Sequence, residues 1–222
     1  VLKPNMVLPG AGNPVSNYLY LEDATERRNS YSADQSVFAG YLMGDIWATK
    51  KLRVVTGARL ETTDIFVRSF DQDEKTGELN EVDILPALNT SYALTKNSNL
   101  RAAYSRTLAR PTFREIAPFA TYDFSTNWII VGNPDLERTL VNNLDFRYEM
   151  FPNFGELISI GGFYKSFTNP IELVFNTQAQ NEELTWRNIE SATVYGAEFE
   201  IKKKLGFMSD SVNTFNIGGN LT

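Results

Sequence analysis

The sequence contains neither cysteine nor histidine among its 222 residues. Without cysteine there is no disulfide framework and no thiolate-bound metal. Without histidine the chain lacks the usual zinc ligand and the usual general base, and a Ser-His-Asp triad cannot be assembled. A Gly-x-Ser-x-Gly motif is also missing. We therefore expect no enzymatic activity, no metal site and no cofactor.

Long apolar runs and basic stripes are missing as well. No stretch reaches about 18 apolar residues, which excludes a transmembrane helix but not a β-barrel, because barrel strands give a much weaker signal. The net charge is −6, so nucleic acid is not an expected partner. The chain opens on a polar segment with prolines and glycines. Because this is not a signal peptide, we expect a fragment of an exported precursor that carries one.

The sequence does contain a clear alternation of period two, which is most complete over residues 142–166. A strand places successive side chains on opposite faces, so this pattern predicts one apolar and one charged face. Pro152 and Gly155 then interrupt it before a second apolar-biased run begins at Leu157, which predicts a β-hairpin. In the first half the two alternating sets are Leu144, Phe146, Tyr148 and Met150 against Asn143, Asp145, Arg147 and Glu149.

The same pattern recurs along the chain and predicts eight strands. Residues 31–47 separate their two faces poorly. Pro86, within the third segment, predicts a strand end or a bulge because proline cannot donate to a ladder. The predicted strands lie at about residues 31–47, 52–70, 82–94, 100–107, 142–150, 157–166, 193–202 and 214–221.

The connections between these strands alternate in length along the chain. Short ones lie near residues 49, 97, 153 and 208, and long ones near 76, 124 and 178. In an up-and-down antiparallel sheet, all short turns then lie at one end and all long loops at the other. This asymmetry is typical of outer-membrane barrels and has no reason to arise in a Greek-key sandwich.

The predicted fold is therefore all-β, with antiparallel up-and-down strands that form part of a large transmembrane β-barrel. The loops are long for a closed eight-stranded barrel, and the chain stops at Thr222 without a terminal aromatic strand. We expect residues 1–30 to form an extracellular-type loop and residues 31–222 to form the partial barrel. The excursion at residues 108–139 is expected to be irregular, and the one at 167–190 to contain two short strands, IELVF and ELTWRNI.

Several motifs resemble the barrel of TonB-dependent outer-membrane receptors, in the form found in Bacteroidetes, over roughly residues 31–222. The motifs are AYSRTLARPTFREIAPF (103–119), VGNPDL (131–136), NNLDFRYEMFPNFGELISIGGFYKSFTNPIE (142–172) and VYGAEFEIKKKL (194–205). The resemblance implies a barrel of about 22 strands with an N-terminal plug. It also implies uptake of a scarce nutrient, such as a siderophore, haem, a vitamin or a glycan, across the bacterial outer membrane.

The resemblance further implies a set of partners: outer-membrane lipid, the plug, TonB and an external small-molecule or glycan ligand. The family's plug, TonB box and complete C-terminus do not occur in this sequence, so we expect a fragment that cannot transport alone. The alternative hypothesis is a soluble or surface-exposed β-domain that binds carbohydrate or protein.

Candidate ligand-binding residues lie in the excursion at 108–139. Arg110 could line an extracellular vestibule, or Pro111 could simply end the strand while Arg110 hydrogen-bonds loop carbonyls. The aromatic side chains could stack on a flat or amphipathic ligand, or they could pack the loop against itself. GNPDL is interpreted as a structural turn. The aromatic candidates are Phe119, Tyr122, Phe124 and Trp128.

Candidate residues facing the lumen or the plug lie on the charged side of the strands. Their mixture of signs favours a barrel wall with Arg–Glu pairs across the ladder over an ion-selective pore. The close pair Glu198 and Glu200 is interpreted as ordinary strand chemistry and not as a glycosidase dyad. The candidates are Arg53, Arg59, Arg101, Arg147, Glu149, Glu198 and Glu200.

Overall fold

A computed structural model of the protein describes residues 30–70, 75–123, 125–177, 183–205 and 215–222. The predicted loop at residues 1–30 lies outside the described residues except for Ser30, and so does Phe124.

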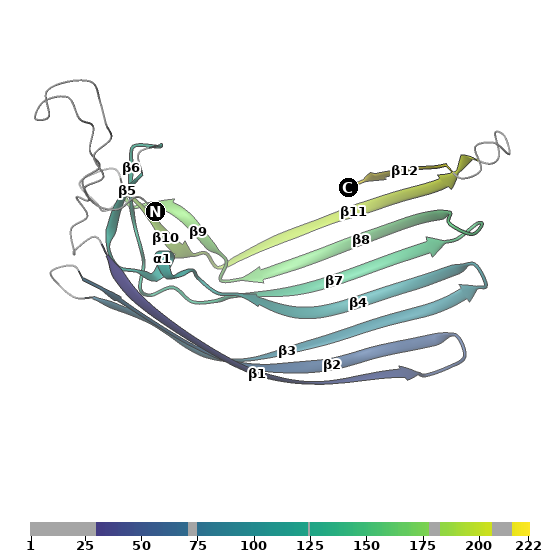
Figure 1. Ribbon diagram of the computed structural model, residues 1–222, viewed down its shortest axis with the longest axis horizontal. Helices are drawn as coiled ribbons and strands as arrows, with labels where there is room; N and C mark the ends of the chain where they lie inside the picture. Colours follow the sequence, from purple (N-terminus) through teal and green to yellow (C-terminus); the bar gives the residue numbers. More distant parts are fainter. Residues whose placement is uncertain (1–29, 71–74, 124, 178–182, 206–214) are drawn as a thin grey trace, which may run out of the picture.

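Eight strands form one antiparallel sheet in which each strand pairs with the next along the sheet order (Figure 1). The sheet is open, with β1 and β12 at its two edges. The prediction of eight up-and-down strands is confirmed. The strands in sheet order are β1 (Tyr31–Trp47), β2 (Leu52–Ser69), β3 (Thr76–Thr95), β4 (Ser98–Ala109), β7 (Thr139–Met150), β8 (Leu157–Thr168), β11 (Ser191–Lys204) and β12 (Asn216–Leu221).

The connections sort to the two ends of the sheet as predicted, although their lengths do not all match. The turns that join β1–β2, β3–β4 and β7–β8 lie at one end, where β11 also ends, and the two longer excursions lie at the other (Figure 1). The predicted long loop at residues 71–81 is wrong from Thr76 onward, where β3 begins opposite Arg68. The charged side chains there suggested a loop, but Glu78 alternates with the buried Leu79 and so belongs to a strand.

Pro86 lies inside β3, where no strand end occurs. The ladder to β2 runs through it, with Pro86 opposite Ala58, whereas the ladder to β4 begins only at Ala87. Proline has no N–H to donate, which fits a position where pairing to one neighbour stops. The register irregularity of β3 lies further on, between Ala93 and Thr95.

The two longer excursions together build a second sheet, in the order β5-β6-β10-β9. The parallel pairing of β6 with β10 joins one excursion to the other. The predicted IELVF and ELTWRNI strands are confirmed as β9 and β10. The excursion at 108–139, predicted as irregular, contains β5, β6 and the short helix α1. The bounds are α1 (Phe113–Ile116), β5 (Ala120–Asp123), β6 (Trp128–Val131), β9 (Ile171–Phe175) and β10 (Glu183–Asn188).

Helix α1 begins at a capping box that the sequence analysis overlooked. Glu115 N donates to Thr112 Oγ1 at 3.4 Å, and Thr112 N donates to Glu115 Oε2 at 2.7 Å. The spacing Thr-x-x-Glu is the signature of this motif, and it sits directly after Pro111.

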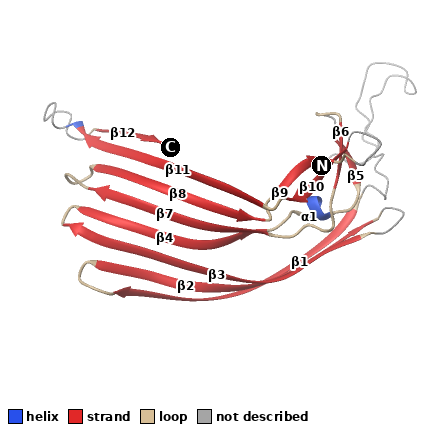
Figure 2. Ribbon diagram, turned by 180° about the vertical axis from the view of Figure 1, so that it is seen from behind, coloured by secondary structure: helices blue, strands red, loops and turns tan. Residues whose placement is uncertain are grey.

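The large sheet has two chemically distinct faces. The outer face carries large apolar side chains that no described part of the chain covers; Leu42 is 83% exposed and Tyr195 is 78% exposed. The inner face carries the charged side chains, such as Arg147 and Glu200. No layer of helices covers either face in the described part of the chain (Figure 2).

The hydrophobic core sits at the excursion end of the inner face. Ile65 and Val67 of β2 and Leu79 of β3 point to this face and are buried. The first excursion supplies the other half of the core, so it folds back over the inner face. Its buried members are Ile116, Ala117, Phe119 and Leu136, and Ile171 and Trp186 pack against them.

Candidate functional site

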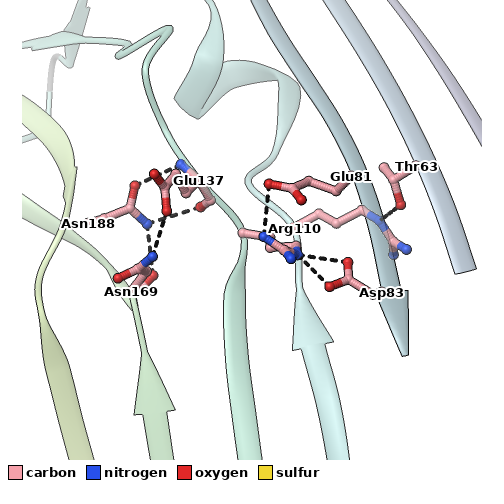
Figure 3. Close-up of polar contacts among 8 residues, drawn as sticks. Thr63, Glu81, Asp83, Arg110, Glu137, Asn169 and Asn188 are labelled. Carbon is pink, nitrogen blue, oxygen red and sulfur yellow. Dashed lines mark hydrogen bonds and ion pairs between the residues drawn. The ribbon is translucent and has the colours of Figure 1, made fainter. Parts of the chain in front are cut away.

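The excursion between β4 and β7 is fastened at its start by Arg110. The Arg110 side chain forms an ion pair with Glu61. Its Nε donates to Thr63 Oγ1 at 2.9 Å (Figure 3). Glu61 also accepts from Arg59 Nε at 2.7 Å and is only 6% exposed. Burial, followed by the neighbouring charge of Arg59, lowers the pKa of Arg110 from its ordinary value. Arg110 is therefore bound to strand side chains, and not to loop carbonyls.

The same excursion is fastened at its end by Arg138. Its Nη1 lies 2.8 Å from Glu81 Oε1, and its Nε lies 2.7 Å from Asp83 Oδ1. Asp83 is 5% exposed. Figure 3 shows Glu81 and Asp83 beside Arg110. The sequence analysis overlooked Arg138, although its place directly before β7 mirrors that of Arg110 directly after β4.

A cluster of amides joins the two excursions (Figure 3). Glu137 N donates to Asn188 Oδ1 at 2.8 Å, and Asn188 Nδ2 donates to Asn169 O at 2.7 Å. Asn169 Nδ2 in turn donates to Glu137 Oε2 at 2.6 Å. Asn169 adopts a left-handed φ of 54°, a conformation that asparagine tolerates better than most residues.

GNPDL forms a turn, as interpreted from the sequence, and its members also contact the core. A Cβ at Gly132 would collide with the carbonyl of Ala117, so only glycine fits. Asn133 Oδ1 accepts from Asp135 N at 3.0 Å, and its Nδ2 donates to Trp186 O at 2.9 Å. Leu136 is buried in the core.

The predicted ligand-binding aromatics divide between core and surface. Phe119 lies in the core with its ring 5.5 Å from that of Tyr31, so its side chain packs the excursion. Tyr122 is exposed and donates to Asn127 Oδ1 at 2.8 Å. Trp128 makes an edge contact, at 5.1 Å, with Phe175 of the other excursion.

Phe175 is 62% exposed and was not among the predicted candidates. The sequence feature that could have revealed it is the alternation that places Ile171, Leu173 and Phe175 on one face of β9. The core lies at the Ile171 end of this face, and the exposed Phe175 ring, with the half-buried Trp128 against it, lies at the other. We call the pair Trp128 and Phe175 the aromatic tip.

The charged inner face forms ion pairs across the ladder, as the mixture of signs predicts. Arg101 Nε lies 2.8 Å from Glu149, and Arg147 Nη2 lies 2.6 Å from Glu200. Arg147 reaches β11 across β8 at Gly161, its register partner, which has no side chain to block the path.

Two further candidates lie elsewhere on the inner face. Arg53 binds Asp45 through two bonds of 3.0 and 2.6 Å. Glu198 lies opposite Gly161 and lines a hollow of about 510 Å³ with Arg147 and Glu200. This face is a wall of ion-paired and hydrogen-bonding side chains. Among the described residues no group of three or more histidine, cysteine, aspartate or glutamate side chains could hold a metal ion.

Comparison with known proteins identifies the family. The sequence matches the outer membrane protein beta-barrel family over residues 15–221. The chain belongs to this family. The protein is therefore located in the bacterial outer membrane, and the apolar outer face of the sheet is the one that contacts lipid.

Solved structures share the fold of this family member. The siderophore receptor PirA from Pseudomonas aeruginosa has a TM-score of 0.57 at 16% identity, over 79% of this chain and 40% of that one. The Serratia marcescens hemophore receptor HasR, in complex with hemophore HasA and heme, has a TM-score of 0.64 at 12% identity, over 76% and 32%. The copper transporter OprC has a TM-score of 0.62 at 13% identity, over 78% and 27%.

The chain thus spans between about a quarter and two fifths of the length of these proteins. The expected likeness to receptor barrels is confirmed for the fold. Curated proteins give no match.

Proposed function

We propose that the chain forms part of the barrel wall of a TonB-dependent receptor, which takes up a scarce nutrient across the outer membrane. The observation that carries this proposal is the folding of both excursions over the inner face, where Arg110 and Arg138 fasten the first of them to buried carboxylates. Loops fixed in this way form part of the lumen mouth, where a ligand arriving from outside must pass.

The class of ligand is argued from the exposed surface of the excursions. The aromatic tip suits a flat or amphipathic molecule because aromatic faces and edges pack on such groups. Proteins of like fold include a siderophore receptor, a receptor crystallised with a hemophore and heme, and a copper transporter. We infer a ligand of the siderophore, haem, vitamin or glycan classes, and transport instead of catalysis.

The inner-face ion pairs support a plug as a partner of this wall. Arg101, Arg147, Glu149 and Glu200 already balance one another, so the wall offers hydrogen bonds without a strong field of one sign. A plug seated against this wall, and TonB as the source of energy, complete the proposal. A soluble carbohydrate- or protein-binding domain fits poorly, because it would leave the apolar outer face in water.

The proposal is tested by uptake with the full-length protein in cells. Labelled ferric siderophores, haem, a vitamin and oligosaccharides are offered to cells with and without TonB, and accumulation is measured. We expect one class to accumulate only when TonB is present. TonB-independent accumulation, or none for any class, would contradict the proposal.

The role of the aromatic tip is tested with the same ligand. The double substitution Trp128→Ala and Phe175→Ala should raise the Kd roughly ten-fold, as for loss of a buried aromatic contact. Phe154→Ala is the matched control, because Phe154 is an exposed aromatic in the β7–β8 turn at the opposite end of the sheet. If both variants change the Kd equally, the aromatic tip does not contact the ligand.

A further inference from the structure

The turn end of the sheet forms a continuous rim. Lys51 O accepts from Ala93 N at 2.8 Å, which joins the β1–β2 turn to β3. Asn97 O accepts from Phe151 N at 2.8 Å, which joins the next two turns. We define the turn rim as residues 48–51, 96–97, 151–156 and 203–205.

The turn rim has a strong positive bias. Glu156 is its one acidic residue, and this carboxylate is already bound by Lys203 Nζ at 2.8 Å. The excursions differ, since their described residues between 110–138 and 169–190 carry seven acidic and four basic side chains. The basic residues of the rim are Lys50, Lys51, Lys96, Lys203 and Lys204.

Three of these lysines have free ammonium groups. Lys50, Lys51 and Lys96 are exposed, and within the described part of the chain none of them forms an ion pair. The hydrogen bond of Lys51 uses its backbone carbonyl and leaves the side chain free. An exposed cation without a protein partner is open to an anion from outside.

The free lysines lie at the border of the apolar outer face. Lys51 directly precedes the outward Leu52, and Lys96 follows Leu94, which is 41% exposed, by two residues. Lysine extends its charged end toward headgroups while its stem covers apolar surface.

We propose that the turn rim binds the anionic headgroups of phospholipids in the leaflet that faces the periplasm. Short turns lie on the periplasmic side of outer-membrane barrels, so this rim meets that leaflet. Lysines near a membrane surface attract anionic lipids, and each contributes about a five-fold preference. This inference rests on the outer-membrane location alone, so it stands or fails separately from any transported ligand.

The test uses the full-length protein reconstituted in phosphatidylcholine vesicles. Electron paramagnetic resonance of spin-labelled phosphatidylglycerol and phosphatidylcholine gives the relative association of each lipid with the barrel. We expect phosphatidylglycerol to be preferred. The Lys51→Gln, Lys96→Gln double variant should lower this preference at least about five-fold.

The matched control removes two lysines from the inner face, Lys165→Gln with Lys202→Gln. It changes the net charge equally and should leave the preference unchanged. Far-UV circular dichroism first establishes that both double variants are folded, and only folded protein is compared. The proposal is overturned if the wild type does not prefer phosphatidylglycerol, or if the two doubles lower the preference equally.

Discussion

Glu61 and Asp83 are register partners on β2 and β3, and each receives an arginine from an opposite end of one excursion. Arg110 arrives from the end of β4 and Arg138 from the start of β7, so the excursion closes over this carboxylate pair. Both carboxylates are buried, and a buried charge needs its partner. The acidic pair therefore fixes where the excursion lies on the inner face.

Loss of one anchor should loosen the excursion. Arg138→Gln leaves Asp83 buried without its cation, and removing one partner of a buried ion pair costs about 3 kcal/mol of unfolding free energy. Denaturant unfolding in detergent measures the loss, and hydrogen exchange at residues 110–138 locates it. The control is Arg53→Gln, because the pair with Asp45 is about half exposed and solvent screens it, so its loss should change stability little. Equal losses in the two variants would contradict the anchoring role.

The glycine of GNPDL should be irreplaceable. In Gly132→Ala the new methyl group meets the carbonyl of Ala117, and relief requires a backbone shift that costs about 1–3 kcal/mol. Gly40→Ala is the control, because a Cβ there meets nothing within 4 Å. Thermal unfolding of both variants in detergent tests the difference. A Gly132→Ala protein as stable as Gly40→Ala would exclude close packing at this turn.

The β7–β8 turn should lose stability in acid. The Lys203 ammonium, and then the Asn153 amide, hold the pKa of Glu156 below its ordinary value of 4.5. A carboxylate with a lowered folded pKa stabilises the protein above the unfolded pKa, and this contribution disappears as pH falls through the folded value. Unfolding of the wild type and Glu156→Gln should therefore differ by a constant amount above about pH 5.5. That difference should shrink below pH 4.5, and a pH-independent difference would contradict the assignment.

A charge on the outer face should be far more harmful than one on the inner face. Phe146→Arg places a guanidinium in lipid and should cost about 2–4 kcal/mol near the bilayer midplane. Asn143→Arg places the same group on the hydrated inner face, where the cost should be small. Folding into vesicles at graded urea concentrations gives both values. A larger loss of folding free energy for Asn143→Arg than for Phe146→Arg would contradict the assignment of the two faces.

Local alternation was sufficient to predict the large sheet. The hairpin of β7 and β8 was readable because each apolar residue, such as Leu144, has a charged neighbour, such as Asp145. The start of β3 was misread because Glu78 carries charge beyond the apolar band, where an outward residue meets water. Charge alone therefore does not distinguish a loop from a protruding hairpin.

The site was less predictable because it depends on contacts between distant segments. The parallel pairing of Glu183 with Ile129 joins two excursions, and no local pattern encodes it. Phe119 and Trp128 look alike in the sequence, yet one lies in the core and the other at the surface. Arg138 acquires its role only because Asp83 lies opposite it.

The central claim is that successive residues of β7 face lipid and lumen in turn. These 222 residues contain no cysteine. Spin labels are attached at single cysteines replacing Leu144, Asp145, Phe146 and Arg147 in the full-length protein in a bilayer, with any cysteine outside these residues replaced by serine. Collision rates with oxygen, which concentrates in lipid, should be high at 144 and 146, and those with a water-soluble nickel chelate should be high at 145 and 147. Rates that do not alternate, or that alternate in the opposite sense, would contradict the assignment of the two faces.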